Sequence, residues 1–157
     1  MKSENILVLH DIRSAQNVGA IFRTADACGI SKIILSGYSP TPFDRFGRKR
    51  SDISKSALGA EESVAWEFSE NIIETLKKLK EENFKIISIE QTENSVDYKN
   101  VKVGDKNIFV VGNEVSGVEK DILDISDFIV EIKMLGKKES LNVSVATGIA
   151  LFGMLKI

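Results

Sequence analysis

Short apolar segments recur along the chain between turn residues, and they predict five strands. The segments are rich in isoleucine and valine and cover residues 6–9, 32–35, 84–89, 108–111 and 128–132. Most of them lack the alternation of polar and apolar residues that a half-exposed strand shows. The pattern is typical of strands covered on both faces, as in a parallel sheet.

Helical periodicity fills the spaces between these strands. Residues 17–28 carry an apolar face, and residues 69–82 carry another behind Ser69, the predicted N-cap. This alternation predicts a three-layer α/β fold with a mostly parallel sheet. The length of 157 residues fits one domain over residues 1–157.

The last segment, residues 142–157, is apolar on nearly every side. Its sequence is NVSVATGIALFGMLKI, in which Lys156 is the only charged residue. A helix of this kind should be buried on most sides. We therefore expect one face to cover the sheet and another to meet a second subunit in a homodimer.

Composition excludes several kinds of site. The chain has one cysteine, Cys28, and one histidine, His10, so a disulfide framework, a zinc cluster and a metal site are not expected. We interpret both residues as structural. No apolar run approaches the roughly 18 residues of a membrane span, and a cytoplasmic location is expected.

The formal net charge of −2 argues against a nucleic-acid partner, but one stretch is basic. Between residues 43 and 56, five basic residues face two acidic ones. The basic residues are Arg45, Arg48, Lys49, Arg50 and Lys55. Such a patch fits a few phosphates or an ordinary solvated loop, and charge alone does not separate the two.

The first of three motifs lies in residues 17–29 and reads NVGAIFRTADACG. Asn17 is placed to cap a helix, and Gly19 allows another backbone to approach the first turn. Arg23 follows nearly two turns after Asn17, so both side chains are expected near one site. A simple N-cap and a surface ion pair are the alternatives.

The second motif, residues 108–118, is a buried strand that ends in the turn GNEVSG. It resembles a phosphate-binding loop, but Val118 and Glu119 stand where that loop needs lysine and serine or threonine. What remains is a turn at a strand end, where open α/β sheets bind ligands, carrying the carboxylate of Glu114. An ordinary tight turn is the alternative.

The third motif joins residues 132–136, IKMLG, to residues 139–146, ESLNVSVA. Ser140 or Asn142 is expected to cap the final helix. The free N–H groups of a helix start also suit a ligand carboxylate or a developing oxyanion.

In this order and spacing, the three motifs resemble the SpoU/TrmH family of RNA methyltransferases, in the SPOUT superfamily. The matching patterns are NxGaxxRtAdaxG, vxGnExxGv and eSLNvsvA, and the stretches GYSPTP and SKSALGAEE are similar too. The resemblance implies a C-terminal trefoil knot, which periodicity does not predict. It also implies S-adenosylmethionine as cofactor, held near Ile89, Gly112, Ile132, Met134, Gly136, Ser140 and Leu141.

The same resemblance implies transfer of a methyl group to a ribose 2′-hydroxyl of RNA. The family's polar site residues match Asn17, Arg23, Glu114, Ser140 and Asn142. Arginine is effectively never neutral in proteins, so we expect Arg23 to hold a phosphate and stabilise the developing alkoxide rather than act as a base.

The resemblance also favours an RNA-binding role for the basic stretch, where Phe43 and Phe46 interleave with arginines. By analogy, transfer RNA is slightly favoured over ribosomal RNA as the substrate. Two rival hypotheses are a non-catalytic RNA-binding protein with this fold and an enzyme that methylates a base nitrogen or a protein.

Overall fold

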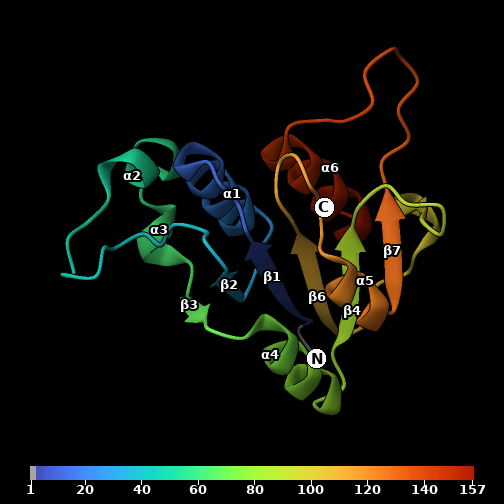
Figure 1. Ribbon diagram of the computed structural model, residues 1–157, viewed down its shortest axis with the longest axis horizontal. Helices are drawn as coiled ribbons and strands as arrows, with labels where there is room; N and C mark the ends of the chain where they lie inside the picture. The colour runs from blue at the N-terminus through green and yellow to red at the C-terminus, as the bar shows by residue number, and fades with distance from the viewer. Residues whose placement is uncertain (1–2) are drawn as a thin grey trace.

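The structure is a computed structural model that describes residues 3–157, and it is built on one parallel sheet (Figure 1). Seven strands lie in the order β3-β2-β1-β6-β4-β7-β5, and every pairing between neighbours is parallel. The strands are β1 (Glu4–His10), β2 (Lys32–Ser36), β3 (Trp66–Ser69), β4 (Lys85–Ile89), β5 (Val96–Asp97), β6 (Lys106–Val111) and β7 (Phe128–Glu131).

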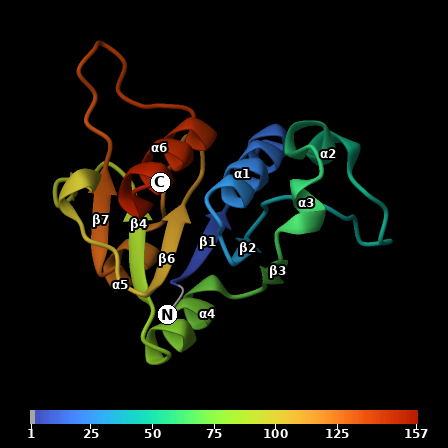
Figure 2. The same ribbon diagram turned by 180° about the vertical axis from the view of Figure 1, so that it is seen from behind.

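Helices cover both faces of the sheet, which gives the predicted three layers (Figures 1 and 2). The helices are α1 (Ala15–Ala27), α2 (Ser51–Ala57), α3 (Ala60–Ser63), α4 (Ile72–Glu81), α5 (Lys120–Ile125), α6 (Val143–Leu155) and a 3₁₀ turn, η1 (Tyr98–Asn100). Among residues 3–157, none of the helices is long and apolar enough to cross a membrane.

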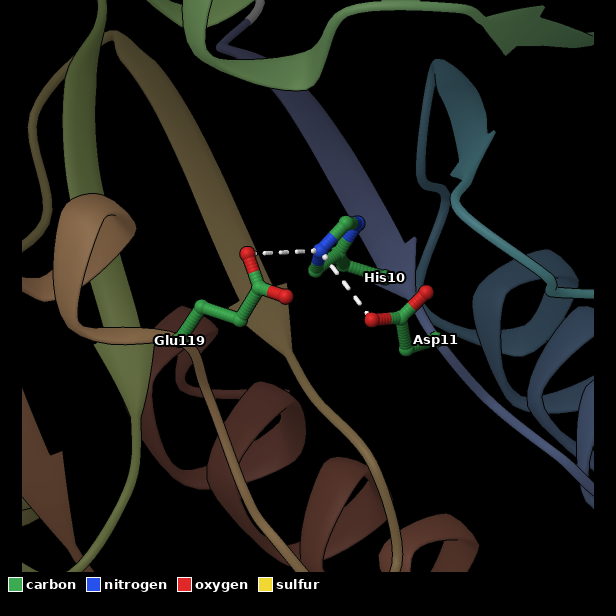
Figure 3. A group of neighbouring side chains, drawn as sticks. All are labelled: His10, Asp11 and Glu119. Atoms are coloured by element: carbon green, nitrogen blue, oxygen red, sulfur yellow. Dashed lines mark ion pairs between the residues drawn. The ribbon is translucent and has the colours of Figure 1, made fainter.

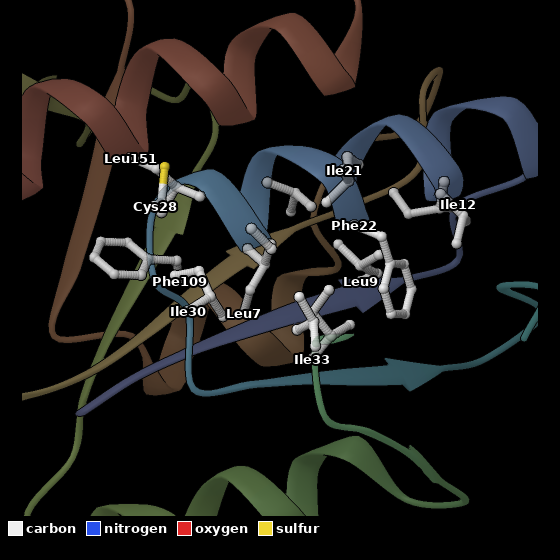
Figure 4. Packing of buried hydrophobic residues seen from close by; sticks show 14 of the residues in the cluster. Leu7, Leu9, Ile12, Ile21, Phe22, Cys28, Ile30, Ile33, Phe109 and Leu151 are labelled. Carbon is white, nitrogen blue, oxygen red and sulfur yellow. The ribbon is translucent and has the colours of Figure 1, made fainter. Parts of the chain in front are cut away.

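Successive residues of the strands pack alternately into two separate hydrophobic cores, one on each face of the sheet. Leu7 and Leu9 of β1 pack on one face with α1, α2, α3 and α6, as Figure 4 shows for α1 and α6. Ile6 and Val8 point to the other face, where α4 and α5 cover them. Burial of both faces explains why the strand sequences are apolar without alternation.

Cys28 lies in the first core, at the end of α1 (Figure 4). Burial raises the pKa of its thiol to about 11. The group therefore stays protonated at neutral pH, which fits the structural role expected for it.

All five predicted strands are present, and two short ones, β3 and β5, were not predicted. The helix expected over residues 69–82 is α4, but its N-cap is Asn71, whose side chain accepts a hydrogen bond from Glu74 N at 3.1 Å. The prediction of Ser69 as N-cap was wrong, because Ser69 ends β3 and bonds to Thr75 Oγ1 at 2.7 Å.

The path of the chain leaves a natural ligand position at the carboxyl ends of the central strands. The first three strands step outward from β1, whereas the later strands build the sheet on its other side and return β6 next to β1. Ligands in open parallel sheets bind beyond the carboxyl ends of the strands, near such a reversal. The start of the first motif, the turn of the second and the loop of the third lie at this edge.

Candidate active site

The turn after β6 is closed by its own backbone and by one side chain. Asn113 and Gly117 exchange two backbone hydrogen bonds, at 3.1 and 2.9 Å. The Oδ1 atom of Asn113 accepts from the N–H groups of Val115 and Ser116, both at 2.9 Å. A Cβ at Gly112 would collide with the Gly117 carbonyl, so this turn needs glycine there.

The Glu114 carboxylate crosses from this turn to the start of α1. It accepts hydrogen bonds from the backbone N–H of Arg13 at 2.9 Å and of Ser14 at 3.0 Å. A third bond comes from Asn17 Nδ2 at 3.1 Å. Glu114 is therefore not simply an exposed turn residue, because it fixes the segment in which the first motif begins.

Asn17 continues this chain of contacts to the third motif. Its Oδ1 atom accepts a hydrogen bond from Asn142 Nδ2 at 3.2 Å. Asn142 is also the N-cap of α6, since its Oδ1 atom accepts from Ser144 N at 2.9 Å. One polar chain, Glu114–Asn17–Asn142, thus joins all three motifs.

The predicted N-cap is confirmed for α6 but not for α1. Asn142 caps α6, as predicted, whereas Ser140 lies exposed before the helix and has no side-chain bond among the described residues. The prediction of Asn17 as an N-cap was wrong, because α1 starts earlier and Ser14 accepts from Asn17 N at 3.2 Å. This leaves the Asn17 amide free to link Glu114 and Asn142.

Gly19 behaves as predicted. A Cβ there would meet the side chain of Ser56 and the carbonyl of Ile53, so α2 packs directly against the first turns of α1. Ser56 Oγ also donates to the carbonyl of Gln16 at 2.9 Å.

A cavity of about 210 Å³ lies beside the polar chain, at the carboxyl ends of β4, β6 and β7. Its lining includes six of the seven predicted cofactor residues: Ile89, Gly112, Ile132, Met134, Ser140 and Leu141. Gly136, in the loop between β7 and α6, does not line it.

The lining also contains residues that the sequence did not single out. Among them are Glu90 and Glu131, each at or close after the end of a strand. Glu90 holds the second motif in place, since its Oε2 atom accepts from Val118 N at 2.8 Å. Its position after an apolar strand is the signal that would have found it.

The charges of the cavity are all of one sign. Glu90, Glu114 and Glu131 line it, and no lysine, arginine or histidine among the described residues does. Burial raises the pKa of Glu114, but hydrogen bonds from Arg13 N, Ser14 N and Asn17 outweigh this and hold it below its ordinary value. The cavity therefore suits a cationic ligand and opposes a phosphate.

Arg23 does not join the polar chain. It lies exposed on α1 and makes no side-chain hydrogen bond or ion pair with any of residues 3–157. Six residues of helix turn its direction by roughly 120° from that of Asn17 and move it about 9 Å along the axis. The expectation that both side chains point to one site of the same chain is not supported.

The basic stretch lies at the opposite edge of the sheet from the cavity, in the loop before α2 and in α2 itself (Figures 1 and 2). Three of its cations are paired to carboxylates: Arg48 to Asp44 at 2.8 Å, Lys49 to Glu62 at 2.9 Å, and Arg50 to Asp52 at 2.6 Å. Among the described residues, Arg45 and Lys55 have no such partner.

The two phenylalanines of this stretch differ in their availability. Phe43 stacks on Trp66, with ring centroids 6.4 Å apart, so packing occupies it and supports a packing role for Trp66. Phe46 is 65% exposed and lies beneath the guanidinium groups of Arg45 and Arg48. Of the two rings, Phe46 is the one open to a base.

The sequence of the chain is similar to those of proteins described as RNA methyltransferases. Over 154 residues the chain is 38% identical to a protein of Borreliella burgdorferi described as an uncharacterized tRNA/rRNA methyltransferase, covering 96% of this chain and 64% of the relative. It is 35% identical over 146 residues to the 23S rRNA (guanosine-2′-O-)-methyltransferase RlmB of Neisseria meningitidis, covering 93% and 56%. The chain thus spans about three-fifths of the length of these curated relatives.

The fold is also that of solved structures. The AdoMet-bound rRNA methyltransferase of Sinorhizobium meliloti superposes with a TM-score of 0.87 and 25% identity, over 99% of this chain and 57% of the other. The model of the SpoU rRNA methylase family matches residues 4–152. The chain therefore belongs to the SpoU rRNA methylase family.

Proposed function

We propose that this chain is an S-adenosylmethionine-dependent RNA methyltransferase that modifies a ribose 2′-hydroxyl of transfer or ribosomal RNA. The observation that carries the proposal is the Glu114–Asn17–Asn142 chain of hydrogen bonds beside a cavity that no basic side chain of the described residues lines. The relatives named as RNA methyltransferases, one of them a 2′-O-methyltransferase, support the same reaction.

The lining of the cavity supports the proposed cofactor through its charge and its apolar surface. When bound, S-adenosylmethionine supplies an electrophilic methyl group on a positively charged sulfur. Three glutamates line the cavity, which favours such a cation. Gly112, Ile132 and Met134 offer backbone groups and apolar surface for a nucleoside, and Ser140 and Leu141 border the same space.

The residues of the polar chain have positioning roles in this proposal. Glu114 fixes the segment before α1, and Asn142 fixes the start of α6, so the rims of the cavity hold one relative arrangement. A rigid rim aligns the ribose oxygen with the methyl group, and alignment supplies much of the acceleration when the donor is already activated. The exposed Ser140 hydroxyl is free to bind the ribose.

Arg23 acts, in this proposal, at a boundary between two subunits. α6 leaves Val145, Ile149 and Phe152 exposed at helical spacing, on the outer side of the layer that it shares with α1. Pairing of two chains through this stripe would bring the exposed Arg23 of α1 to the boundary, where it holds a phosphate of the RNA and stabilises the developing alkoxide. The small cavity volume, below the roughly 300 Å³ usual for ligand sites, also favours a second subunit as a further wall.

RNA binding rests on the basic stretch in this proposal. Arg45, Lys55 and the exposed Phe46 are the groups with free capacity for phosphate or base contacts. Because the stretch lies far from the cavity of its own chain, an RNA of some length must bridge the two, as folded transfer or ribosomal RNA does. Transfer RNA remains the slightly favoured substrate by analogy.

The proposal also includes the knot in the backbone and the number of domains. The segment after β7 forms a trefoil knot and, together with the rest of residues 1–157, a single methyltransferase domain. Support comes from α6, which packs against η1 so closely that a Cβ at Gly153 would strike the Tyr98 ring. An experimental structure that traces residues 86–143 tests the knot.

The decisive experiment supplies purified protein with S-adenosylmethionine labelled in its methyl group and with total RNA from cells that lack the gene. The expected result is label in RNA, recovered after nuclease digestion as one 2′-O-methylnucleoside. Label in a base would favour the base-methylating rival. RNA binding without transfer would favour a non-catalytic RNA-binding protein.

A further inference from the structure

A cluster of three ligand-type side chains lies at the carboxyl end of β1, built by His10, Asp11 and Glu119 (Figure 3). His10 Nε2 lies 3.4 Å from Asp11 Oδ2 and 3.3 Å from Glu119 Oε2. The three ligand atoms all lie within 4.8 Å of one another. Two elements far apart in sequence, the end of β1 and the start of α5, thus present one nitrogen and two carboxylate oxygens to the same point.

The imidazole of His10 is buried and only half satisfied. The residue is 7% exposed, and its Nδ1 atom lies 2.8 Å from Ser36 Oγ. Its Nε2 atom is buried and has no hydrogen-bond partner among residues 3–157, although two carboxylates flank it. A buried polar atom without a partner is costly, and in a native protein it needs an explanation such as a bound ion or water.

Asp11 is held in place by its surroundings. Its backbone is left-handed, with φ of 57°, a conformation that aspartate tolerates better than most residues. Its Oδ1 atom accepts from Tyr38 N at 3.1 Å, which leaves Oδ2 toward His10. A Cβ at Gly37 would collide with that Oδ1 atom, so glycine at this position keeps room for the carboxylate.

We propose that His10, Asp11 and Glu119 bind a divalent transition-metal ion of the Zn²⁺ class. One imidazole nitrogen with two carboxylates suits Zn²⁺ and its neighbours, whereas Mg²⁺ and Ca²⁺ prefer oxygen ligands alone. Metal–ligand bonds of about 2.0–2.2 Å in a tetrahedron place neighbouring ligand atoms about 3.3 Å apart. The distances from Nε2 to the two carboxylate oxygens, 3.4 and 3.3 Å, match this spacing.

The contacts behind the ligands also suit a metal. With Nε2 on the ion, Nδ1 carries the proton and donates to Ser36 Oγ, the outer contact that orients metal-bound histidines. The Glu119 side chain is 58% exposed and can adjust, and water completes the fourth position. A bound ion would tie β1 to the segment that leaves the second motif, and so brace the turn at residues 112–118 from its far side.

The site is independent of the proposed methyl transfer, and metal binding tests it directly. Protein stripped with a chelator is titrated with ZnCl₂ by calorimetry, and with CoCl₂ while visible absorption is followed. We expect one ion per chain, a change in the Co²⁺ spectrum and a higher unfolding temperature with Zn²⁺. Ser36→Ala should weaken binding by about tenfold or more, through loss of the outer contact.

A substitution at an exposed ligand tests the site even if substitution of the buried His10 unfolds the protein. Glu119→Gln removes a ligand at an exposed position and should lose most of the affinity, and His10→Ala should abolish binding. Asp121→Asn, an exposed carboxylate of the same helix outside the cluster, should bind as the wild type does. The proposal is overturned if the wild type binds no Zn²⁺, which would leave a simple His10 ion pair, or if Glu119→Gln binds Zn²⁺ unchanged.

Discussion

Asn17 Nδ2 donates to Glu114 Oε1 across 3.1 Å, although 97 residues separate the two in sequence. The same amide accepts from Asn142 through its oxygen, so both ends of the Asn17 side chain are used. An amide is the one side chain of this length that donates at one end and accepts at the other. This explains why asparagine, and neither aspartate nor leucine, suits the position.

Glu114→Gln should uncouple the second motif from α1. The variant keeps one acceptor oxygen, so the bonds from Arg13 N and Ser14 N cannot both be kept, and stability should fall by about 1 kcal/mol. Methyl transfer should fall with it. Urea unfolding and the methylation assay measure both effects, and Glu70→Gln, at an exposed site outside the network, is the control that should change stability by less than about 0.5 kcal/mol.

The contribution of Glu114 should depend on pH in a defined direction. Because its folded-state pKa lies below the ordinary 4.5, the stabilisation is fully present above about pH 4.5 and is lost as pH falls through the lower value. The difference in unfolding free energy between wild type and Glu114→Gln should therefore be constant near neutrality and shrink in acid. A difference that grows on acidification would contradict the assignment.

Arg23→Ala should nearly abolish methyl transfer and leave S-adenosylmethionine binding almost intact. The side chain is exposed, unpaired among the described residues and outside the cavity lining, so its loss disturbs neither fold nor cofactor site. Calorimetry with S-adenosylmethionine and turnover on RNA separate the two effects. Near-normal turnover would show that Arg23 has no part in the reaction.

The basic residues should contribute unequally to RNA binding. Arg45→Glu and Lys55→Glu should weaken binding and flatten its salt dependence more than Arg48→Glu or Arg50→Glu, whose cations are already paired with carboxylates. Filter binding at several salt concentrations gives the slopes. Equal effects at all four positions would mean that the ion pairs open when RNA binds.

Charges on the outer stripe of α6 should separate the subunits. Ile149→Glu combined with Phe152→Glu places two carboxylates on the proposed interface and should give monomers in sedimentation. Leu58→Asp, on the exposed end of α2, is the matched control and should leave the assembly unchanged. If the wild type itself sediments as a monomer at micromolar concentration, the dimer proposal fails.

The central strands were predictable because both faces of each are buried, as in Ile6 to Leu9 of β1. The hydrophobic pattern did not predict β3, whose residues Glu67 and Phe68 are exposed, or β5, which has only two residues. Edge strands bury fewer side chains, so their sequences lack the run of apolar residues from which a strand is predicted.

Within the candidate site, motif residues that occupy strand ends and helix starts were predictable, as Glu114 and Asn142 illustrate. The expectation for Arg23 failed because Ser14 starts α1 earlier than expected, which places Asn17 inside the helix, and six residues of helix turn Arg23 by roughly 120° from Asn17. The His10 cluster also escaped prediction. Glu119 lies far from His10 in sequence, and only the sheet order, with β6 beside β1, brings the two together.

The sheet ends on both sides in very short strands, β3 with four residues and β5 with two. Such edges offer few free backbone groups, so another chain gains little by extending the sheet. Self-association through continued strand pairing, a common start of aggregation, is thereby disfavoured. The proposed contact between copies of this chain uses the helical layer instead, where side-chain shape rather than backbone pairing would select the partner.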